Sequence, residues 1–580
     1  MKFSLLAEYF EKIEKTSSRL EITHHLSELF KTLPAEDFDH AIYLLQGRVL
    51  PLFEATEFGI AGKMVVKAAI QAMNLESVYF NKILKERGDV GTTVEEFKKQ
   101  YESFESKDLS VSEVYDKLLE LAQKGGSGSQ QEKMSILAQL IRQLDPLSTR
   151  YLVRIPLGVM RLGFSDMTVL DGFSWMVAGD KSLREEIENA YHVRPDLGYI
   201  GKQLKLHGAS GLKEVKPEIF TPILMMRAER LSSGAEIIEK IGKCAVEPKF
   251  DGFRLQVHIK KHGATSEVKL FSRNLEDVGF MYPDVVEGIS KQLTVKEAIL
   301  EGEAIGFDPV RESFLPFQET SQRKRKHGID EKMKEIPLRL FAFELLYADG
   351  KTYMQSPLTE RRAMLMKVVK TKNDPKKDIV LIADNEVTDD PKHVEQLFED
   401  AIAKGLEGIL AKKLDGTYRA GAREWNWIKF KRSYSSKIED TVDCLVMGYD
   451  YGQGKRTDFG IGAFLVGVYD EKNDQFLTVS KIGTGLTDDE WREMRKRCDK
   501  LKSATQPALY QVEKLMNVDV WVKPSIVVEI KADEITKSKS MHTAGLALRF
   551  PRLVRFRDDK RAEETTALKE MESIFKGQKK

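Results

Sequence analysis

Cysteine and long apolar runs are what this 580-residue sequence has least of. Its three cysteines, Cys244, Cys444 and Cys498, lie far apart and form no CxxC pair. This excludes a disulfide scaffold and a zinc site built from cysteines. Uncharged apolar runs stay below 18 residues, so we expect no membrane span, and the start MKFSLLAEYFEKIEK lacks the apolar core of a signal peptide. These absences favour a soluble, cytoplasmic protein with no membrane partner.

An excess of charge of one sign is also missing. Lys and Arg total 91 against 90 Asp and Glu, for a net charge of +1. This excludes a uniformly basic protein, but a local basic face remains compatible with the neutral sum. The 42% of hydrophobic residues is sufficient for globular folding, and the length predicts three to four domains.

The residue pattern changes twice along the chain. Residues 1 to about 205 carry apolar residues at helical spacing, and Pro217 and Pro222 mark a boundary after them. From about residue 240 the pattern alternates, as in 253–259, and helical segments follow, which indicates mixed α/β structure. After about Arg432, short apolar β-branched strands predict a small barrel, followed by a helix over 562–575. We expect domains at 1–212, 213–432 and 433–580.

The sharpest local pattern is Lys249-Phe250-Asp251-Gly252, which follows Glu247-Pro248 and precedes Phe253-Arg254. A lysine side chain has an ordinary pKa of about 10.4, so acting as a nucleophile at pH 7 costs it about 4.6 kcal/mol. Burial, neighbouring cations or a metal ion lower that cost. The tetrapeptide alone is also compatible with a charged lysine at the surface start of a strand.

Further charged residues follow at strand ends or on one strand face. Arg273 follows the second predicted strand. Glu301 and Glu303 are two apart, so they share a face and suit Mg²⁺. Glu407 lies among apolar residues, where an unpaired charge is costly. A solvated strand face or a strand-end turn explains these acids equally well.

Two basic segments suit a polyanion. Lys429 and Lys431 alternate in EWNWIKFKR and therefore share a strand face. From 535 to 557 there are six Lys or Arg and no acid, interleaved with apolar residues as in a folded strand. An edge strand protected by lysines and a generic basic surface are the alternatives.

Taken together and in this order, the segments resemble the motifs of ATP-dependent DNA ligases of the three-domain archaeal and eukaryotic replicative type. The resemblance rests on K-x-D-G-x-R at 249–254, Ser272-Arg273-Asn274, Glu301-Gly302-Glu303, Phe341–Leu346, Glu407-Gly408, Lys429-Phe430-Lys431 and 549–560. It extends to 88–91, 154–163 and 190–198 in the helical region. Glu301 and Glu344 stand where the family more often has Asp, so their carboxylates reach one methylene further.

The resemblance implies an all-α N-terminal DNA-binding domain, an α+β nucleotidyltransferase (adenylation) domain and a C-terminal β-barrel OB-fold domain. It implies that Lys249 is the nucleophile, that ATP (with ADP or dATP as alternatives) and Mg²⁺ (or Mn²⁺) are the cofactors, and that nicked duplex DNA is the partner of a monomer. The cofactor-binding residues it implies are Glu247, Arg254, Arg273, Glu303, Phe343, Arg423, Lys429 and Lys431. The implied metal ligands are Glu303 and Glu407, and the implied C-terminal motif residues are Arg549, Arg552, Arg555, Arg557, Asp559 and Lys560.

Four other classes share part of this pattern. A capping guanylyltransferase also uses K-x-D-G but needs no 200-residue helical region, and an RNA ligase usually lacks that region. A non-catalytic clamp would not need the intact lysine, arginines and carboxylates. An NAD-dependent ligase carries a four-cysteine zinc finger, which three scattered cysteines exclude. The segment 100–104, QYESF, is a weak candidate for binding a sliding clamp.

Overall fold

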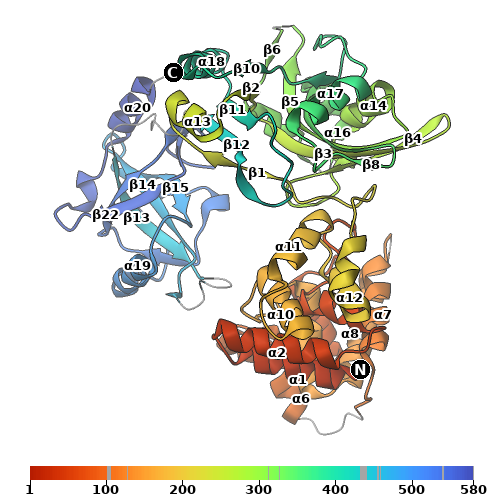
Figure 1. The fold of residues 1–580 in the computed structure, drawn as a ribbon. Helices are drawn as coiled ribbons and strands as arrows, with labels where there is room; N and C mark the ends of the chain where they lie inside the picture. Colours follow the sequence, from red (N-terminus) through yellow and green to blue (C-terminus); the bar gives the residue numbers. More distant parts are fainter. Residues whose placement is uncertain are drawn as a thin grey trace. The chain divides into compact units, whose positions relative to one another are not determined.

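The protein is described by a computed structural model that covers all residues except 101–105, 127, 311, 326, 432–440, 453–455, 457–458, 539–540 and 579–580. The clamp-binding candidate at 100–104 therefore lies largely outside the described residues. The chain divides into two compact units, Met1–Phe430 and Lys431–Lys580. Figure 1 shows that the first unit contains a helical part and a part built on sheets.

Helices are the main elements of the described residues between 3 and 207, as the spacing of the apolar residues predicts. The apolar faces meet in one buried core that includes Phe3, Leu6 and Phe10. Ser110 and Glu113 form a capping box at the start of α7. The helices are α1 (Phe3–Glu14), α2 (Arg19–Thr32), α3 (Phe38–Leu45), α4 (Gly62–Met73), α5 (Ser77–Arg87), α6 (Val90–Gln100), α7 (Val111–Gln123), α8 (Ser129–Gln143), α9 (Pro146–Arg154), α10 (Asp166–Ala178), α11 (Arg184–Val193) and α12 (Leu197–His207).

The rest of the first unit contains two sheets. One has the strand order β1-β12-β11-β2-β10, and the other β4-β3-β5-β7-β8, with β6 beside β5 and β9 beside β7. The first comprises β1 (Arg227–Arg230), β2 (Cys244–Lys249), β10 (Glu386–Thr388), β11 (Gly408–Lys413) and β12 (Arg423–Lys431). The second comprises β3 (Phe253–His262), β4 (Thr265–Phe271), β5 (Glu297–Asp308), β6 (Ser313–Phe314), β7 (Leu338–Ala348), β8 (Lys351–Thr352) and β9 (Val380–Ile382).

Helices pack on each of these sheets. The buried apolar side chains of α13 and α18 join those of β2, β11 and β12 in one core. Those of α14 and α17 join β3, β5 and β7 in another. The helices are α13 (Gly234–Ile241), α14 (Pro283–Gln292), α15 (Phe317–Thr320), α16 (Ile329–Glu335), α17 (Leu358–Val368) and α18 (Pro391–Ala403).

The chain crosses from the first sheet to the second within three residues, 250–252. A side chain at Gly252 would place its Cβ 2.4 Å from the carbonyl oxygen of Ala304. Only glycine allows this approach, because no real Cβ tolerates so short a contact. The crossing fixes the predicted lysine motif at the junction of the two sheets.

The second unit is rich in strands, as the sequence predicts. Its large sheet has the order β16-β18-β13-β14-β15-β17, with β19 between β13 and β22, and β20 pairs with β21. The elements are β13 (Val442–Asp450), β14 (Ala463–Asp470), β15 (Gln475–Ile482), α19 (Asp488–Lys500), β16 (Lys502–Ser503), β17 (Tyr510–Gln511), β18 (Val520–Val522), β19 (Val527–Lys531), β20 (Glu534–Lys537), β21 (Leu546–Arg549), β22 (Arg552–Phe556) and α20 (Leu568–Gly577).

The predicted C-terminal helix begins later than the expected residue 562. A single 3-10 turn occupies Ala562–Glu564, and α20 starts at Leu568. The backbone of Thr566 explains the delay: its N–H donates to Asp443 and its carbonyl accepts from Tyr469. Because strands β13 and β14 take both groups, Thr566 cannot contribute them to a helix.

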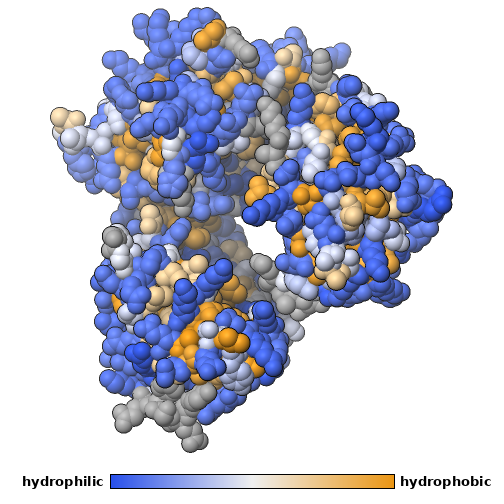
Figure 2. All heavy atoms as spheres, turned by 180° about the vertical axis from the view of Figure 1, so that it is seen from behind, coloured by the Kyte–Doolittle hydropathy of each residue, from blue (hydrophilic) through white to orange (hydrophobic). Residues whose placement is uncertain are grey.

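The surface is mainly hydrophilic, as the high content of charged residues predicts. In the face shown in Figure 2, hydrophilic residues predominate and hydrophobic ones form small groups. Among the described residues no helix is both long and apolar enough to cross a membrane.

Cys244, Cys444 and Cys498 are buried and unbridged.

Candidate active site

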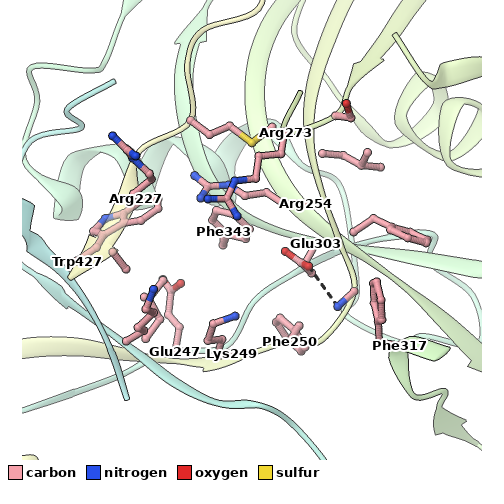
Figure 3. Close-up of a pocket in the computed structure, with 18 of the residues that line it drawn as sticks. Arg227, Glu247, Lys249, Phe250, Arg254, Arg273, Glu303, Phe317, Phe343 and Trp427 are labelled. Atoms are coloured by element: carbon pink, nitrogen blue, oxygen red, sulfur yellow. Dashed lines mark hydrogen bonds between the residues drawn. The ribbon is translucent and has the colours of Figure 1, made fainter. Parts of the chain in front are cut away.

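A cavity of about 440 Å³ in the first unit is lined by residues of both sheets. This volume lies in the range of ligand pockets. Figure 3 shows Lys249, Arg254, Glu303 and Phe343 around it. The sequence-predicted residues that line the cavity are Glu247, Lys249, Arg254, Arg273, Glu303, Phe343, Arg423 and Lys429. The tertiary structure thus gathers residues that are up to 182 positions apart, from Glu247 to Lys429.

Lys249 ends β2 at the wall of the cavity. Its Nζ is hydrogen-bonded to Oε2 of Glu407, and each side chain is about one quarter exposed. The backbone supports this pair, because the N–H of Glu407 donates to the carbonyl of Lys249 at 3.1 Å. The carboxylate that the sequence placed among apolar residues therefore has a cation as its partner, and that cation is the predicted nucleophile.

Glu303 faces the same space from β5. Its Oε1 accepts a hydrogen bond from the N–H of Gly252 at 3.2 Å. The pKa of Glu303 is raised to about 7: burial is the largest cause, Glu407 adds to it, and Lys249 and Arg254 oppose it. The raised pKa therefore reflects mainly the removal of this carboxylate from water.

Glu303→Gln is expected to stabilise the protein while impairing the site. The carboxyl ionises near its ordinary pKa of 4.5 when unfolded but near 7 when folded. Between these pH values the unfolded state binds fewer protons, so stability falls as pH rises. Glutamine removes that penalty, which is about 3 kcal/mol above pH 7 and less than about 0.5 kcal/mol at pH 4.5.

Thermal unfolding without ligands at pH 4.5 and pH 8 measures this difference. Glu239→Gln, an exposed glutamate on α13, is the matched control and should change the melting temperature little at either pH. An equal change in the Glu303→Gln melting temperature at both pH values would contradict the burial argument.

The neighbouring carboxylate Glu301 has a different role. It is fully buried, and its Oε2 accepts from Arg254 Nη2 at 2.7 Å. Gln256 and the hydroxyl of Tyr418 donate to its Oε1 at 3.1 and 3.0 Å. Glu301 and Glu303 are therefore not a pair facing one cation, because hydrogen-bond donors already surround Glu301. Burial works against the charge of Arg254, but Glu301, Tyr418 and Glu303 together outweigh it and the pKa of Arg254 is raised.

Glu344 is likewise engaged within the protein. Its two oxygens accept from Nε and Nη2 of Arg361 at 2.8 and 3.0 Å, and both side chains are almost fully buried. Removing one partner of such a pair leaves an uncompensated buried charge. Glu301 and Glu344 are thus both paired with arginines inside the protein.

Cationic side chains surround the cavity. Arg227, Arg273, Lys324 and Arg423 are exposed and line it. Arg227 and Arg423 are register partners on the parallel strands β1 and β12. Clustered guanidinium groups of this kind attract phosphate groups. Lys431 ends β12 two residues after Lys429, on the same face of the strand.

Sequence reasoning missed several lining residues, among them Arg227, Phe250, Phe317, Lys324 and Trp427. Trp427 could have been predicted from the sequence, since it alternates with Lys429 in the basic strand and therefore shares its face. Arg227 had none, because it precedes the lysine motif at 249–254 and reaches the cavity through the pairing of β1 with β12.

The C-terminal basic motif lies in the second unit, where most of its cations have acidic partners. Lys560 and Arg557 both donate to Asp443, at 2.7 and 3.0 Å. Arg557 also donates to Asp559, and Arg555 to Glu529. Arg552 is paired with Asp533, and Arg549 lies 3.9 Å from Glu534. The motif is therefore folded into the sheet, as its interleaved apolar residues predict.

A lysine, arginines, carboxylates and an aromatic ring share a cavity between two sheets, an arrangement that suits phosphoryl transfer. Family models match the chain as "DNA ligase N terminus" over 2–174, "ATP dependent DNA ligase domain" over 225–431 and "ATP dependent DNA ligase C terminal region" over 457–560. The chain belongs to the ATP-dependent DNA ligase family, whose known activity is the sealing of nicks in DNA.

Proteins of similar sequence match this chain over its full length. A "Probable DNA ligase" of Dictyoglomus turgidum is 46% identical over the whole of this chain and 98% of its own length. "DNA ligase 2" of Thermofilum pendens is 40% identical with the same coverage. The solved structure named "Pmar-Lig_PreS3" has a TM-score of 0.57 at 18% identity and covers 95% of this chain and 99% of its own. That structure supports the multidomain fold.

Proposed function

We propose that Lys249 carries AMP between ATP and a DNA nick. The observation that carries this proposal is the placement of the Lys249 amine at a cavity rich in cations, in hydrogen-bond contact with Glu407. First, the lysine nitrogen attacks the α-phosphorus, and the bond to pyrophosphate breaks. AMP then passes to the 5′-phosphate of the nick. Finally the 3′-hydroxyl attacks that phosphate, which closes the backbone and releases AMP.

The first step requires an unprotonated amine. Glu407 is in position to accept the proton of Lys249, since the two groups share a hydrogen bond. Lys429 and Lys431 would neutralise charge that develops on the α-phosphate, and Arg254, Arg273 and Arg423 would hold ribose or phosphate oxygens. Phe343 would stack on the base, and the backbone at Glu247 would contact its edge.

Glu303 and Glu407 fit a divalent cation. Burial is the largest cause of the raised pKa of Glu303, and the nearby charge of Glu407 adds to it. Among the described residues, no three His, Cys, Asp or Glu side chains gather into a ligand set. This suits Mg²⁺, which uses one or two carboxylates together with phosphate oxygens. When bound, Mg²⁺ or Mn²⁺ would neutralise charge on the phosphates.

The remaining assignments concern the whole chain. We assign a DNA-binding domain to 1–212, an adenylation domain to 213–432 and an OB-fold domain to 433–580. The last would bring Arg549, Arg552, Arg555, Arg557, Asp559 and Lys560 to the β,γ-phosphates during the first step only, and would clamp DNA afterwards. We assign a monomer acting on nicked duplex DNA, and recruitment by a sliding clamp remains a prediction.

The proposal is tested by incubating the protein with Mg²⁺ and ATP labelled at the α-phosphate, followed by denaturation. We expect label on the protein chain from ATP, transfer of label to nicked DNA, and sealing of the nick. GTP is the control nucleotide. Label from GTP alone would indicate capping chemistry, and no label from either nucleotide would indicate a non-catalytic clamp.

A further inference from the structure

The polar side chains of strand β3 are buried. Gln256 and His258 alternate with apolar residues along β3, a pattern typical of a strand with one face in solvent. Both residues are nevertheless 0% exposed. Their partners include backbone groups of the connecting segment, residues 220–226, which follows the helical part and leads into β1. The polar face of β3 is therefore an attachment site for this segment.

The side-chain amide of Gln256 pairs with the backbone of Ile223 as a neighbouring strand would. Its Oε1 accepts from the N–H of Ile223 at 2.7 Å, and its Nε2 donates to the carbonyl of Ile223 at 3.0 Å. The same Nε2 donates to Oε1 of Glu301 at 3.1 Å, and Oε1 lies 3.0 Å from Nε2 of His258. Four contacts use the full hydrogen-bonding capacity of a glutamine amide. The orientation of this amide is therefore fixed.

His258 holds the start of the connecting segment. Its Nδ1 accepts from the N–H of Phe220 at 3.0 Å, so its Nε2 carries the proton that is donated to Gln256. Phe220 has a φ of 71°, which is unfavourable for a residue with a large side chain. Such a conformation persists only where the surrounding contacts impose it. The contacts with β3 thus determine the path of the segment.

The network ends on the guanidinium group of Arg254, which lines the cavity (Figure 3). Nη2 of Arg254 donates to Glu301 at 2.7 Å, and Nη1 donates to the carbonyl of Met226 at 2.8 Å. Tyr418 closes the network, because its hydroxyl donates to Glu301 and accepts from the N–H of Met226 at 2.9 Å. Both Nη atoms of Arg254 are therefore held by groups that Gln256 and Tyr418 join to the connecting segment.

We infer that Gln256 and Tyr418 are positioning residues that fix Arg254 for the first step. Both are 0% exposed, and they act through Glu301 and through the backbone of the connecting segment. A guanidinium group that is already oriented binds ribose or phosphate oxygens without first losing its rotational freedom. This inference rests on the proposed function, because that function gives Arg254 its contact with ATP.

The test is a double-mutant cycle that combines Gln256→Met with Arg254→Ala. The readout is the rate of protein–AMP formation at saturating ATP. Methionine has about the volume of glutamine but makes none of its hydrogen bonds. We expect Gln256→Met to lower the rate about 30-fold, because misplacing a binding group costs up to about 100-fold. In the Arg254→Ala background the same change should cost less than about 3-fold, because the group that Gln256 positions is then absent.

Gln292→Met is the matched control. Oε1 of Gln292 accepts from the N–H groups of Ile379 and Val380 at 3.0 and 2.8 Å, and its Nε2 donates to the carbonyl of Val380 at 2.9 Å. This glutamine therefore holds a backbone segment in the same way, but that segment leads into β9 and not to Arg254. Gln292→Met should lower the melting temperature and change the rate less than about 3-fold.

Equal losses from Gln256→Met in both backgrounds would show a merely structural glutamine and overturn the inference. A wild-type rate in the Arg254→Ala protein would also overturn it, although label on Lys249 would still support the proposed nucleophile. A wild-type chain that takes no label would overturn the proposed function and this inference together.

Tyr418→Phe keeps the test decisive if Gln256→Met does not fold. It removes one hydroxyl and keeps the buried ring, so we expect it to fold. The rate of protein–AMP formation should fall about 10-fold in the wild-type background, since Glu301 loses one of its donors, and less than about 2-fold in the Arg254→Ala background. Losses of the same size in the two backgrounds would contradict the inference.

Discussion

Lys249→Ala is expected to abolish formation of the protein–AMP adduct and to stop sealing of nicks with a free 5′-phosphate. Alanine has no nucleophile, and Lys249 is the lysine whose amine reaches this wall in hydrogen-bond contact with Glu407. Loss of a covalent nucleophile lowers rates by at least about 10⁴-fold. The same variant should still seal nicks that already carry 5′-AMP, because the covalent role of the lysine is then complete.

Gel analysis of labelled protein and of nicked DNA with and without 5′-AMP measures both steps. Lys260→Ala, an exposed lysine on β3, is the matched control and should behave as wild type in both. If a folded Lys249→Ala protein failed on both DNA substrates, the nucleophile assignment would be wrong.

Lys560→Ala is expected to reduce the rate of protein–AMP formation on the order of 100-fold. A loss of this size is typical when an enzyme loses one hydrogen-bond donor that stabilises a developing charge. Sealing of nicks with 5′-AMP should change less than about 3-fold, because the proposed contact with the β,γ-phosphates belongs to the first step. Substitution is preferable to deleting 549–580, because β22 pairs with β19 and Met571 of α20 is fully buried.

Asp443 accepts hydrogen bonds from both Lys560 and Arg557, so loss of Lys560 leaves it with Arg557 as its cationic partner among the described residues. Circular dichroism and thermal unfolding check that the sheet survives. Lys569→Ala, an exposed lysine at the start of α20, is the control. Comparable losses in the first and last steps would argue against a role confined to the first.

Several features of the fold could be predicted because local patterns determine them. The apolar spacing of 3–207 is helical, and the alternation of 253–259 continues as strand β3 to residue 262. Gly252 is required by a close backbone approach that a K-x-D-G turn already suggested. The start of α20 was predicted too early, since long-range hydrogen bonds to Thr566 are invisible in a local apolar pattern.

The sequence by itself determined the class of chemistry, because lysine, arginine and carboxylate side chains carry it wherever they lie. It also determined that helices precede strands, since periodicity is a local property. The tertiary structure decided which carboxylates are available. Glu301 and Glu344 are neutralised by Arg254 and Arg361, while Glu303 faces the cavity with a raised pKa. Burial and pairing between distant segments set that difference, and neither is a property of residue spacing.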